Sequence, residues 1–236
     1  MKTSPGFEVL NERWRHEIKY AIEPLKAARL NAALTPLLRV DSHAGEDGRY
    51  FVKSLYFDTP AFGDYADKEL GADRRRKLRL RSYGASHVYR LELKSKEGLM
   101  NSKLAVSLTL EEAKLLSKGD LSPLRSRDGA ASYLYTLMAS RAYRPALVIK
   151  YERRALLAPG GDFRLTIDTD LKYSRDPASL FCEAAFDIPL PCCVAEIKYG
   201  DFLPLWVSRE IKKSGLAGSE FGKYSLACES AYGYLL

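Results

Sequence analysis

The sequence predicts an α+β protein built on an antiparallel sheet of about eight strands that closes into a barrel, with helices packed on the outside. In several stretches charged and apolar residues alternate, and a period of two is the period of a strand. Short turns separate consecutive stretches of this kind, as expected between antiparallel neighbours. Segments rich in Ala and Leu with helical spacing lie between the hairpins.

The clearest alternating stretch is the basic segment 74–83. Lys77, Arg79 and Arg81 fall on one parity, and Leu78 and Leu80 fall on the other. Side chains on one face of a strand repeat about every 6.6 Å, a spacing that suits an extended polyanion. Taken alone, the stretch fits equally well the solvated outer face of an edge strand.

The first part of the chain alternates between strands and helices. Pro24 stands in a first helical turn, where proline is tolerated. Thr59 and Thr109 can each accept a hydrogen bond at a helix start. We expect strands at 13–22, 50–58, 74–83, 88–96 and 103–108, and helices at 24–38, 59–70 and 110–118, with a mostly helical stretch at 120–143.

The remainder of the chain repeats this organisation. The turn Pro159-Gly160-Gly161 separates two alternating runs, which predicts a hairpin. We expect strands at 146–157, 163–170 and 192–199, and helices at 204–213 and 223–235. With no internal repeat and no linker-like segment, we expect a single domain over 1–236 with a core at about 12–230.

Composition restricts the class of protein. The net charge of +7 favours anionic partners. The four cysteines form no CxxC pair and no signal peptide or apolar run of 18 residues is found, so we expect reduced thiols, a cytoplasmic location and no transmembrane segment. The motifs of P-loops, dinucleotide-binding turns, zinc proteases and serine hydrolases are absent.

At least six predicted strands carry charge on one parity. In a barrel, one parity from every strand points inward, so the interior would be ionic and the outer face apolar beneath helices. A dry ionic interior would be prohibitively costly. An interior filled by water, metal and polyphosphate would satisfy these charges.

Eight short motifs in a fixed order carry a resemblance to a known family. They are RHEIKY at 15–20, LYFDTP at 55–60, KLRLRSYG at 77–84, LELK at 91–94, YER at 151–153, TIDT at 166–169, EIK at 196–198 and FGKY at 221–224. Together they resemble the VTC domain, the polyphosphate polymerase branch of the triphosphate tunnel metalloenzymes. The resemblance implies a tunnel that holds Mn²⁺ or Mg²⁺ and transfers the γ-phosphate of ATP to a growing polyphosphate chain, with release of ADP.

The resemblance also implies roles for individual residues. The implied catalytic phosphate ligands are Lys19, Arg79, Arg81, Lys94, Arg153 and Lys198. Further substrate contacts are implied for Arg15, Glu17, Lys77, Glu92, Lys103, Arg164, Asp168 and Lys223. Glu196 is implied to be the metal ligand.

The sequence departs from the wider family at two positions. The related hydrolases begin with Glu-x-Glu-x-Lys, whereas this chain has Arg15, Glu17 and Lys19. A cation in place of one metal-binding carboxylate argues for the polymerase branch. Glu220 stands where a second basic residue is common, which puts one phosphate contact in doubt. The SPX domain and membrane helices of the eukaryotic complex are missing, so we expect a free-standing bacterial enzyme.

Two other functions remain open: a triphosphate or polyphosphate hydrolase on the same tunnel, and a non-catalytic module that binds polyphosphate or RNA. The interleaved carboxylates disfavour nucleic acid, and no aromatic RNP-like strand is found. Glu196 disfavours a pure polyanion binder, which gains nothing from an acidic interior residue. We therefore expect ATP and inorganic polyphosphate as partners, and no nucleic acid.

Overall fold

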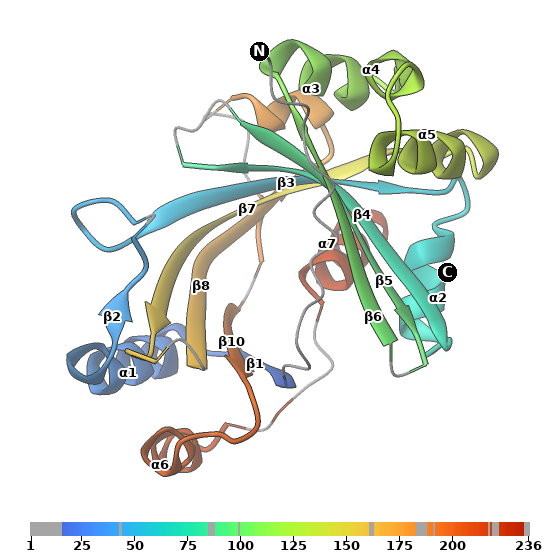
Figure 1. Cartoon of the computed structure of the whole chain (residues 1–236). Helices are drawn as coiled ribbons and strands as arrows, with labels where there is room; N and C mark the ends of the chain where they lie inside the picture. Colours follow the sequence, from blue (N-terminus) through green and yellow to red (C-terminus); the bar gives the residue numbers. More distant parts are fainter. Residues whose placement is uncertain are drawn as a thin grey trace.

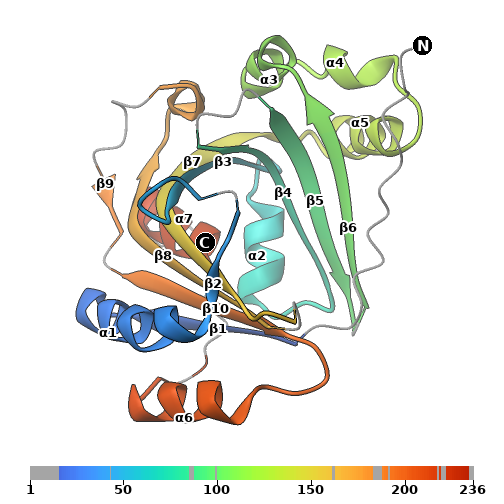
Figure 2. The same ribbon diagram turned by 60° about the vertical axis from the view of Figure 1, so that its left-hand side comes forward.

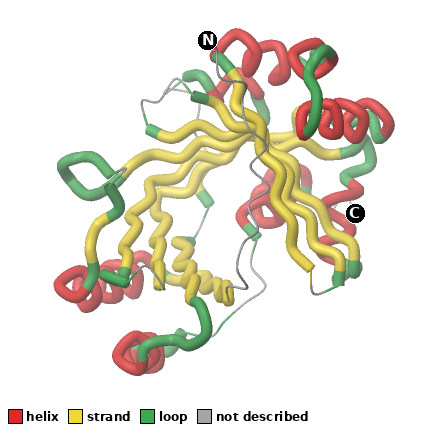
Figure 3. The backbone as a smooth tube through the Cα atoms, viewed as in Figure 1, coloured by secondary structure: helices red, strands yellow, loops and turns green. Residues whose placement is uncertain are grey.

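The computed structural model describes residues 16–42, 44–84, 88–98, 100–160, 163–182, 188–190, 192–216, 218 and 222–233. Within these residues the strands form one antiparallel sheet in the order β1-β10-β8-β7-β3-β4-β5-β6, with β2 paired to β7 and β9 to β8 (Figures 1 and 3). The strands are β1 His16–Ile22, β2 Arg39–Val40, β3 Tyr50–Asp58, β4 Arg74–Tyr83, β5 Tyr89–Glu97, β6 Met100–Leu108, β7 Arg144–Leu157, β8 Phe163–Ser174, β9 Ile188–Pro189 and β10 Cys193–Tyr199.

The α+β tunnel fold is confirmed in the form of a curled half-barrel. Every predicted strand is present. Of the strand predicted at 13–22, residues 13–15 lie outside the described part of the chain. The sheet path ends at β1 and β6, and no ladder joins these two edges within the described residues. The helices around the sheet are α1 Pro24–Leu34, α2 Gly63–Glu69, α3 Leu110–Ser117, α4 Ser122–Arg125, α5 Ala130–Ser140, α6 Leu205–Lys213 and α7 Lys223–Tyr232.

The convex face of the sheet is apolar, as the alternation predicts. Leu78, Leu80 and Leu91 are fully buried in one cluster with residues of α3, α4 and α5. Leu165 and Ile197 lie in a second cluster with residues of α1 and α6. Five helices therefore cover the outside of the sheet, and the opposite parity faces the interior.

Helix α7 packs on the concave side of the sheet. This helix lies within the curve of the sheet, with α2 beside it (Figure 2). The Tyr224 ring stacks on Tyr56 of β3 at 4.7 Å between ring centroids, in a cluster that includes Val52, Ile149 and Val194. Only part of the concave face is therefore ionic, because α7 buries the rest against apolar side chains.

Helix boundaries differ from the sequence expectations in three places. The segment predicted at 24–38 divides into α1 and a 3-10 turn, Thr35–Leu37, and the stretch predicted at 120–143 contains α4 and α5. The helix predicted from Thr59 begins at Gly63, whose N–H donates to Thr59 Oγ1 at 2.8 Å. The Thr109 capping box of α3 is confirmed.

Candidate active site on the concave face

The alternating strands bring most of the predicted residues together on the concave face. They form two groups. The arginine wall comprises Arg79, Arg81, Glu92, Lys103, Arg153, Asp168 and Lys223, from β4–β8 and the start of α7. The lysine wall comprises Glu17, Lys19, Lys94, Glu196 and Lys198. The paired strands β1 and β10 supply four of these residues, and β5 supplies Lys94. Arg15 lies outside the described residues.

Glu92 is one centre of the arginine wall. It is 2% exposed and accepts a 2.9 Å hydrogen bond from Arg79 Nε. Lys103 Nζ lies 3.1 Å and Arg81 Nη1 3.8 Å from its carboxylate oxygens. Burial raises the pKa of Glu92, but the positive charges of Arg79, Arg81 and Lys103 outweigh burial and lower it to about 2. Glu92 is therefore ionised and holds these cations in place.

Asp168 is the second centre and is completely buried. Arg153 donates to both carboxylate oxygens, at 2.7 and 2.8 Å, in the bidentate geometry that a guanidinium favours. Lys223 Nζ contacts the same carboxylate at 2.7 Å. Burial raises the pKa of Asp168, but Arg153 and Lys223 lower it to about 2. The start of α7 is thus fixed to the sheet.

Hydroxyl groups that the alternation did not single out position Arg81. Its Nε donates to Ser54 Oγ at 3.0 Å, and its two terminal nitrogens donate to Tyr83 OH at 3.3 Å and Tyr151 OH at 3.5 Å. The Tyr151 ring also lies 5.2 Å from the Arg153 guanidinium. Tyr151 was visible only as part of the YER motif, because a buried tyrosine on a strand carries no signal that separates core from site.

The lysine wall is less compact. Glu17 accepts from Lys19, from Lys94 at 3.1 Å, and lies 3.4 Å from Lys198 Nζ. Glu196 lies 3.3 Å from the same Lys198 ammonium. The antiparallel register, with Lys19 opposite Glu196 and Glu17 opposite Lys198, explains this arrangement. Burial raises the pKa of Glu17, but the lysines outweigh it and hold the pKa well below its usual range.

Glu196 and Glu17 are the residues that fit a divalent cation. Both carboxylates lie within 3.4 Å of the Lys198 ammonium, so they are neighbours. Burial and the charge of Glu17 raise the pKa of Glu196, but the charge of Lys198 and the other nearby lysines outweighs them and lowers it overall. Thr166, the β8 partner of Glu196, is 4% exposed, and its hydroxyl has no hydrogen-bond partner among the described residues. One or two carboxylates suffice for Mg²⁺ when substrate phosphates supply further oxygens.

No group of three or more His, Cys, Asp or Glu side chains able to hold a metal alone occurs in the described part of the chain. The donor set therefore fits a metal that binds together with a phosphate substrate. It does not fit a protein-only metal cage. Glu196 remains a predicted ligand on this ground, with Glu17 beside it.

Two residues predicted to contact the substrate, Lys77 and Arg164, belong to neither wall. Lys77 makes no ion pair within the described residues; burial lowers its pKa to about 8, and the nearby cations Lys19 and Lys68 contribute. Arg164 lies 2.8 Å from Asp41 and 3.5 Å from Tyr50 OH, so the structure connects it to β3 and the chain after β2 rather than to either wall.

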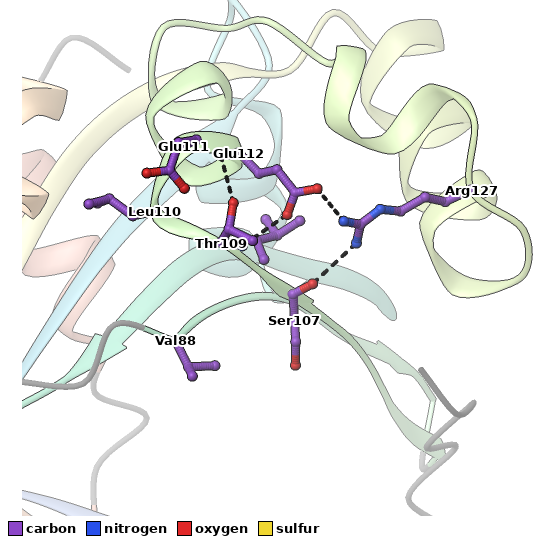
Figure 4. Close-up of a pocket in the computed structure, with 8 residues that line it drawn as sticks. Val88, Ser107, Thr109, Leu110, Glu111, Glu112 and Arg127 are labelled. Carbon is purple, nitrogen blue, oxygen red and sulfur yellow. Dashed lines mark hydrogen bonds and ion pairs between the residues drawn. The ribbon is translucent and has the colours of Figure 1, made fainter. Parts of the chain in front are cut away.

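A cavity of about 720 Å³ lies elsewhere, at the outer corner between β6 and α3 (Figure 4). Arg127 bridges this corner: it pairs with Glu112 and donates to the Ser107 carbonyl oxygen at 3.2 Å. None of the predicted site residues lines it. This cavity lies where Arg127 connects β6 to α3, away from the predicted residues. We therefore place the candidate site on the concave face.

The curled antiparallel sheet and its ionic concave face match the tunnel fold that the ordered motifs predict. The chain belongs to the VTC domain family, whose match covers residues 14–232. Two solved structures share the fold. One is a proposed adenylate cyclase from Bacillus halodurans, with a TM-score of 0.58 and 15% identity over 89% of this chain and 94% of that chain.

The other is a proposed adenylyl cyclase from Hippeastrum, described as having a dominant triphosphatase activity, with a TM-score of 0.51 and 19% identity over 94% of this chain and 98% of that chain. At these identities the likeness shows the fold alone. The comparison with curated proteins finds no match. Among the described residues, no helix is both long and apolar enough to cross a membrane.

Proposed function

We propose that the protein is a metal-dependent polyphosphate polymerase that transfers the γ-phosphate of ATP to the end of a polyphosphate chain and releases ADP. The observation that carries the proposal is the concave face, where basic side chains outnumber the carboxylates they surround. Along β4 these cations follow one another at the strand repeat, which suits an extended phosphate chain. Membership of the VTC domain family supports the same substrate class.

In this proposal the arginine wall binds and orients the transferred phosphate. Phosphoryl transfer depends on in-line positioning and on neutralising charge on the γ-oxygens, more than on a covalent nucleophile. Arg79, Arg81 and Arg153 present planar donor forks, and their counter-ions and hydroxyl partners keep them fixed before substrate arrives. Such preorganisation is what electrostatic catalysis requires.

The lysine wall would hold the metal and the acceptor. Glu196, with Glu17, would bind Mn²⁺ or Mg²⁺, which when bound neutralises charge on the phosphate oxygens. Lys19 and Lys198 would hold the acceptor phosphate close to the γ-phosphate. An oxygen of that terminal phosphate would act as the nucleophile; it is already anionic, so no side chain needs to remove a proton.

A triphosphate or polyphosphate hydrolase is the second candidate. The Hippeastrum protein with the same fold is described as a triphosphatase. Hydrolysis needs water in place of the acceptor phosphate. The Thr166 hydroxyl next to Glu196, which has no hydrogen-bond partner among the described residues, offers a position to hold one. The lysines of this wall favour an anionic acceptor over water, which supports the polymerase.

Incubation with ATP and Mn²⁺ or Mg²⁺ separates the candidates. Gel detection of polyphosphate is combined with quantification of ADP and free phosphate. ADP with polymer and little free phosphate supports the polymerase. ADP with equal free phosphate supports the hydrolase, and binding of polyphosphate without turnover would indicate a non-catalytic module.

A further inference from the structure

The first turn of α7 carries polar groups that the two walls do not use. α7 has ten residues, and its N-cap residue, Gly222, has no side chain to bond the first backbone N–H groups. The first N–H groups of a helix have no partner within the helix and attract anions. They lie beside the ionic interior, because Lys223 in the same turn contacts Asp168 at 2.7 Å.

Ser225 provides an independent sign of a ligand. It is 6% exposed, and its buried hydroxyl oxygen has no hydrogen-bond partner among the described residues. A buried hydroxyl without a partner is costly in a folded protein. Ser225 stands in the first turn, and helical side chains point back toward the N-terminus, so its hydroxyl faces the same space as the first N–H groups of the helix.

Lys77 closes this space from the sheet. A β-carbon placed on Gly222 would lie 3.0 Å from Ser225 Oγ and 3.4 Å from Lys77 Nζ. Gly222 has φ −130° and ψ 120°, a conformation that any residue can adopt. The backbone therefore does not demand glycine here; a side chain would instead occupy the space between the hydroxyl and the ammonium.

We propose that Gly222, Ser225 and Lys77 form a subsite for the terminal phosphate group of a linear phosphate chain. This inference rests on the proposed function, and it specifies which part of the substrate binds at α7. A terminal phosphate has three non-bridging oxygens, which can accept from the helix N–H groups, the hydroxyl and the ammonium together. An internal phosphate has only two.

The turn is held rigidly, as such a subsite requires. Tyr224 OH donates to Asp58 Oδ2 at 2.8 Å, and Asp58 also accepts from the backbone of Asp64 and Tyr65 at the start of α2. Together with the contact between Lys223 and Asp168, this fixes α7 to β3 and β8. The donors are positioned before the ligand arrives, which lowers the entropy lost on binding.

Linear tripolyphosphate and cyclic trimetaphosphate test the proposal, because the ring has no terminal phosphate. Their dissociation constants are measured by calorimetry on the full chain, for wild type and for Ser225→Ala and Gly222→Ala. We expect each variant to bind tripolyphosphate about tenfold more weakly, as for loss of a hydrogen bond to a charged group. Binding of trimetaphosphate should stay within about twofold of wild type.

Matched controls are Ser230→Ala, at the other end of α7, and Gly200→Ala, where an added β-carbon meets nothing within 4 Å. Both should behave as wild type, and thermal unfolding confirms that all variants fold. A third ligand, ATP, identifies the source of the terminal phosphate. An equal loss with ATP assigns the γ-phosphate to the subsite, and a loss with tripolyphosphate alone assigns the end of the polymer.

Equal weakening for linear and cyclic ligands, or no weakening for either, would overturn the subsite while leaving the proposed function intact. A wild-type protein that binds neither ligand would contradict the proposed function, and the subsite with it.

Discussion

The arginine wall and the lysine wall both combine cations with carboxylates, but the carboxylates of the arginine wall are more deeply buried. The Glu92 and Asp168 side chains are 3% and 0% exposed, and each contacts at least two cations. The Glu17 and Glu196 side chains are 21% and 13% exposed, and they share the Lys198 ammonium. The first pair therefore acts as fixed counter-ions that position arginines. The second pair is less buried, and it is the pair to which the proposed function assigns the metal.

Glu196→Gln should produce the largest effect. The substitution preserves size and removes the charge that attracts a divalent cation, so we expect turnover to fall by at least about a hundredfold. Nucleotide binding should partly survive, because the arginine wall is unchanged. The measurement is metal-dependent ADP formation with ATP binding in parallel. Wild-type turnover in this variant would remove Glu196 from the site.

Arg79→Ala and Arg81→Ala should each lower kcat/KM by about ten- to a hundredfold, because charge-assisted hydrogen bonds are worth roughly 1.5–3 kcal/mol. Both should also lower the melting temperature, since the buried Glu92 carboxylate loses a partner. Arg74→Ala is the matched control: Arg74 is exposed and pairs with the exposed Glu97. Equal, mild losses at all three positions that moderate salt abolishes would indicate a surface patch.

Glu92→Gln should change the acid stability of the fold. The pKa of Glu92 is about 2 in the folded protein, below its ordinary value of 4.5. The ionised form therefore stabilises the fold above pH 4.5, and this stabilisation is lost as the pH falls toward 2. Between pH 4.5 and 3, wild type should lose about 1.5 kcal/mol more unfolding free energy than the variant. Parallel urea-unfolding profiles over this range would contradict the role of Glu92 as a charged counter-ion.

Lys77→Met should produce the smallest effect, and one that depends on pH. Lys77 has a pKa of about 8 and loses its charge as the pH rises through that value. Between pH 7 and 9, binding of tripolyphosphate to wild type should weaken about fivefold more than binding to the variant, which corresponds to about 1 kcal/mol. The same dependence on pH in both proteins would show that Lys77 does not contact the ligand.

The sequence predicted the strands and the inward parity because alternation is a local property. The positions of Arg79, Arg81 and Glu196 on the concave face follow from a period of two and from the curl of the sheet. The ordered motifs identified the VTC domain family, which the match over 14–232 confirms. Which cation contacts which carboxylate depends on strand order, and the β1–β10 and β10–β8 neighbours are not adjacent in sequence.

The location of α7 could not be predicted for a different reason. Its residues mix Tyr, Ala, Ser and Cys, without a clear apolar face that would distinguish an inner helix from an outer one. Single hydroxyl groups such as Thr166 and Ser225 carry no periodic signal. Their importance is visible only in the structure, where both are buried and have no hydrogen-bond partner within the described part of the chain.

The edges of the half-barrel have a consequence for how a polymer enters. Within the described residues, β1 and β6 share no ladder, and the ion pair between Glu17 of β1 and Lys94 of β5 reaches from one edge strand to the neighbour of the other. Such a partly exposed pair is worth at most about 1 kcal/mol, so its separation by thermal motion is frequent. Under the proposed function, we expect a seam of this kind to admit a polyphosphate chain from the side, along its length, with no need to thread a free end through a closed ring.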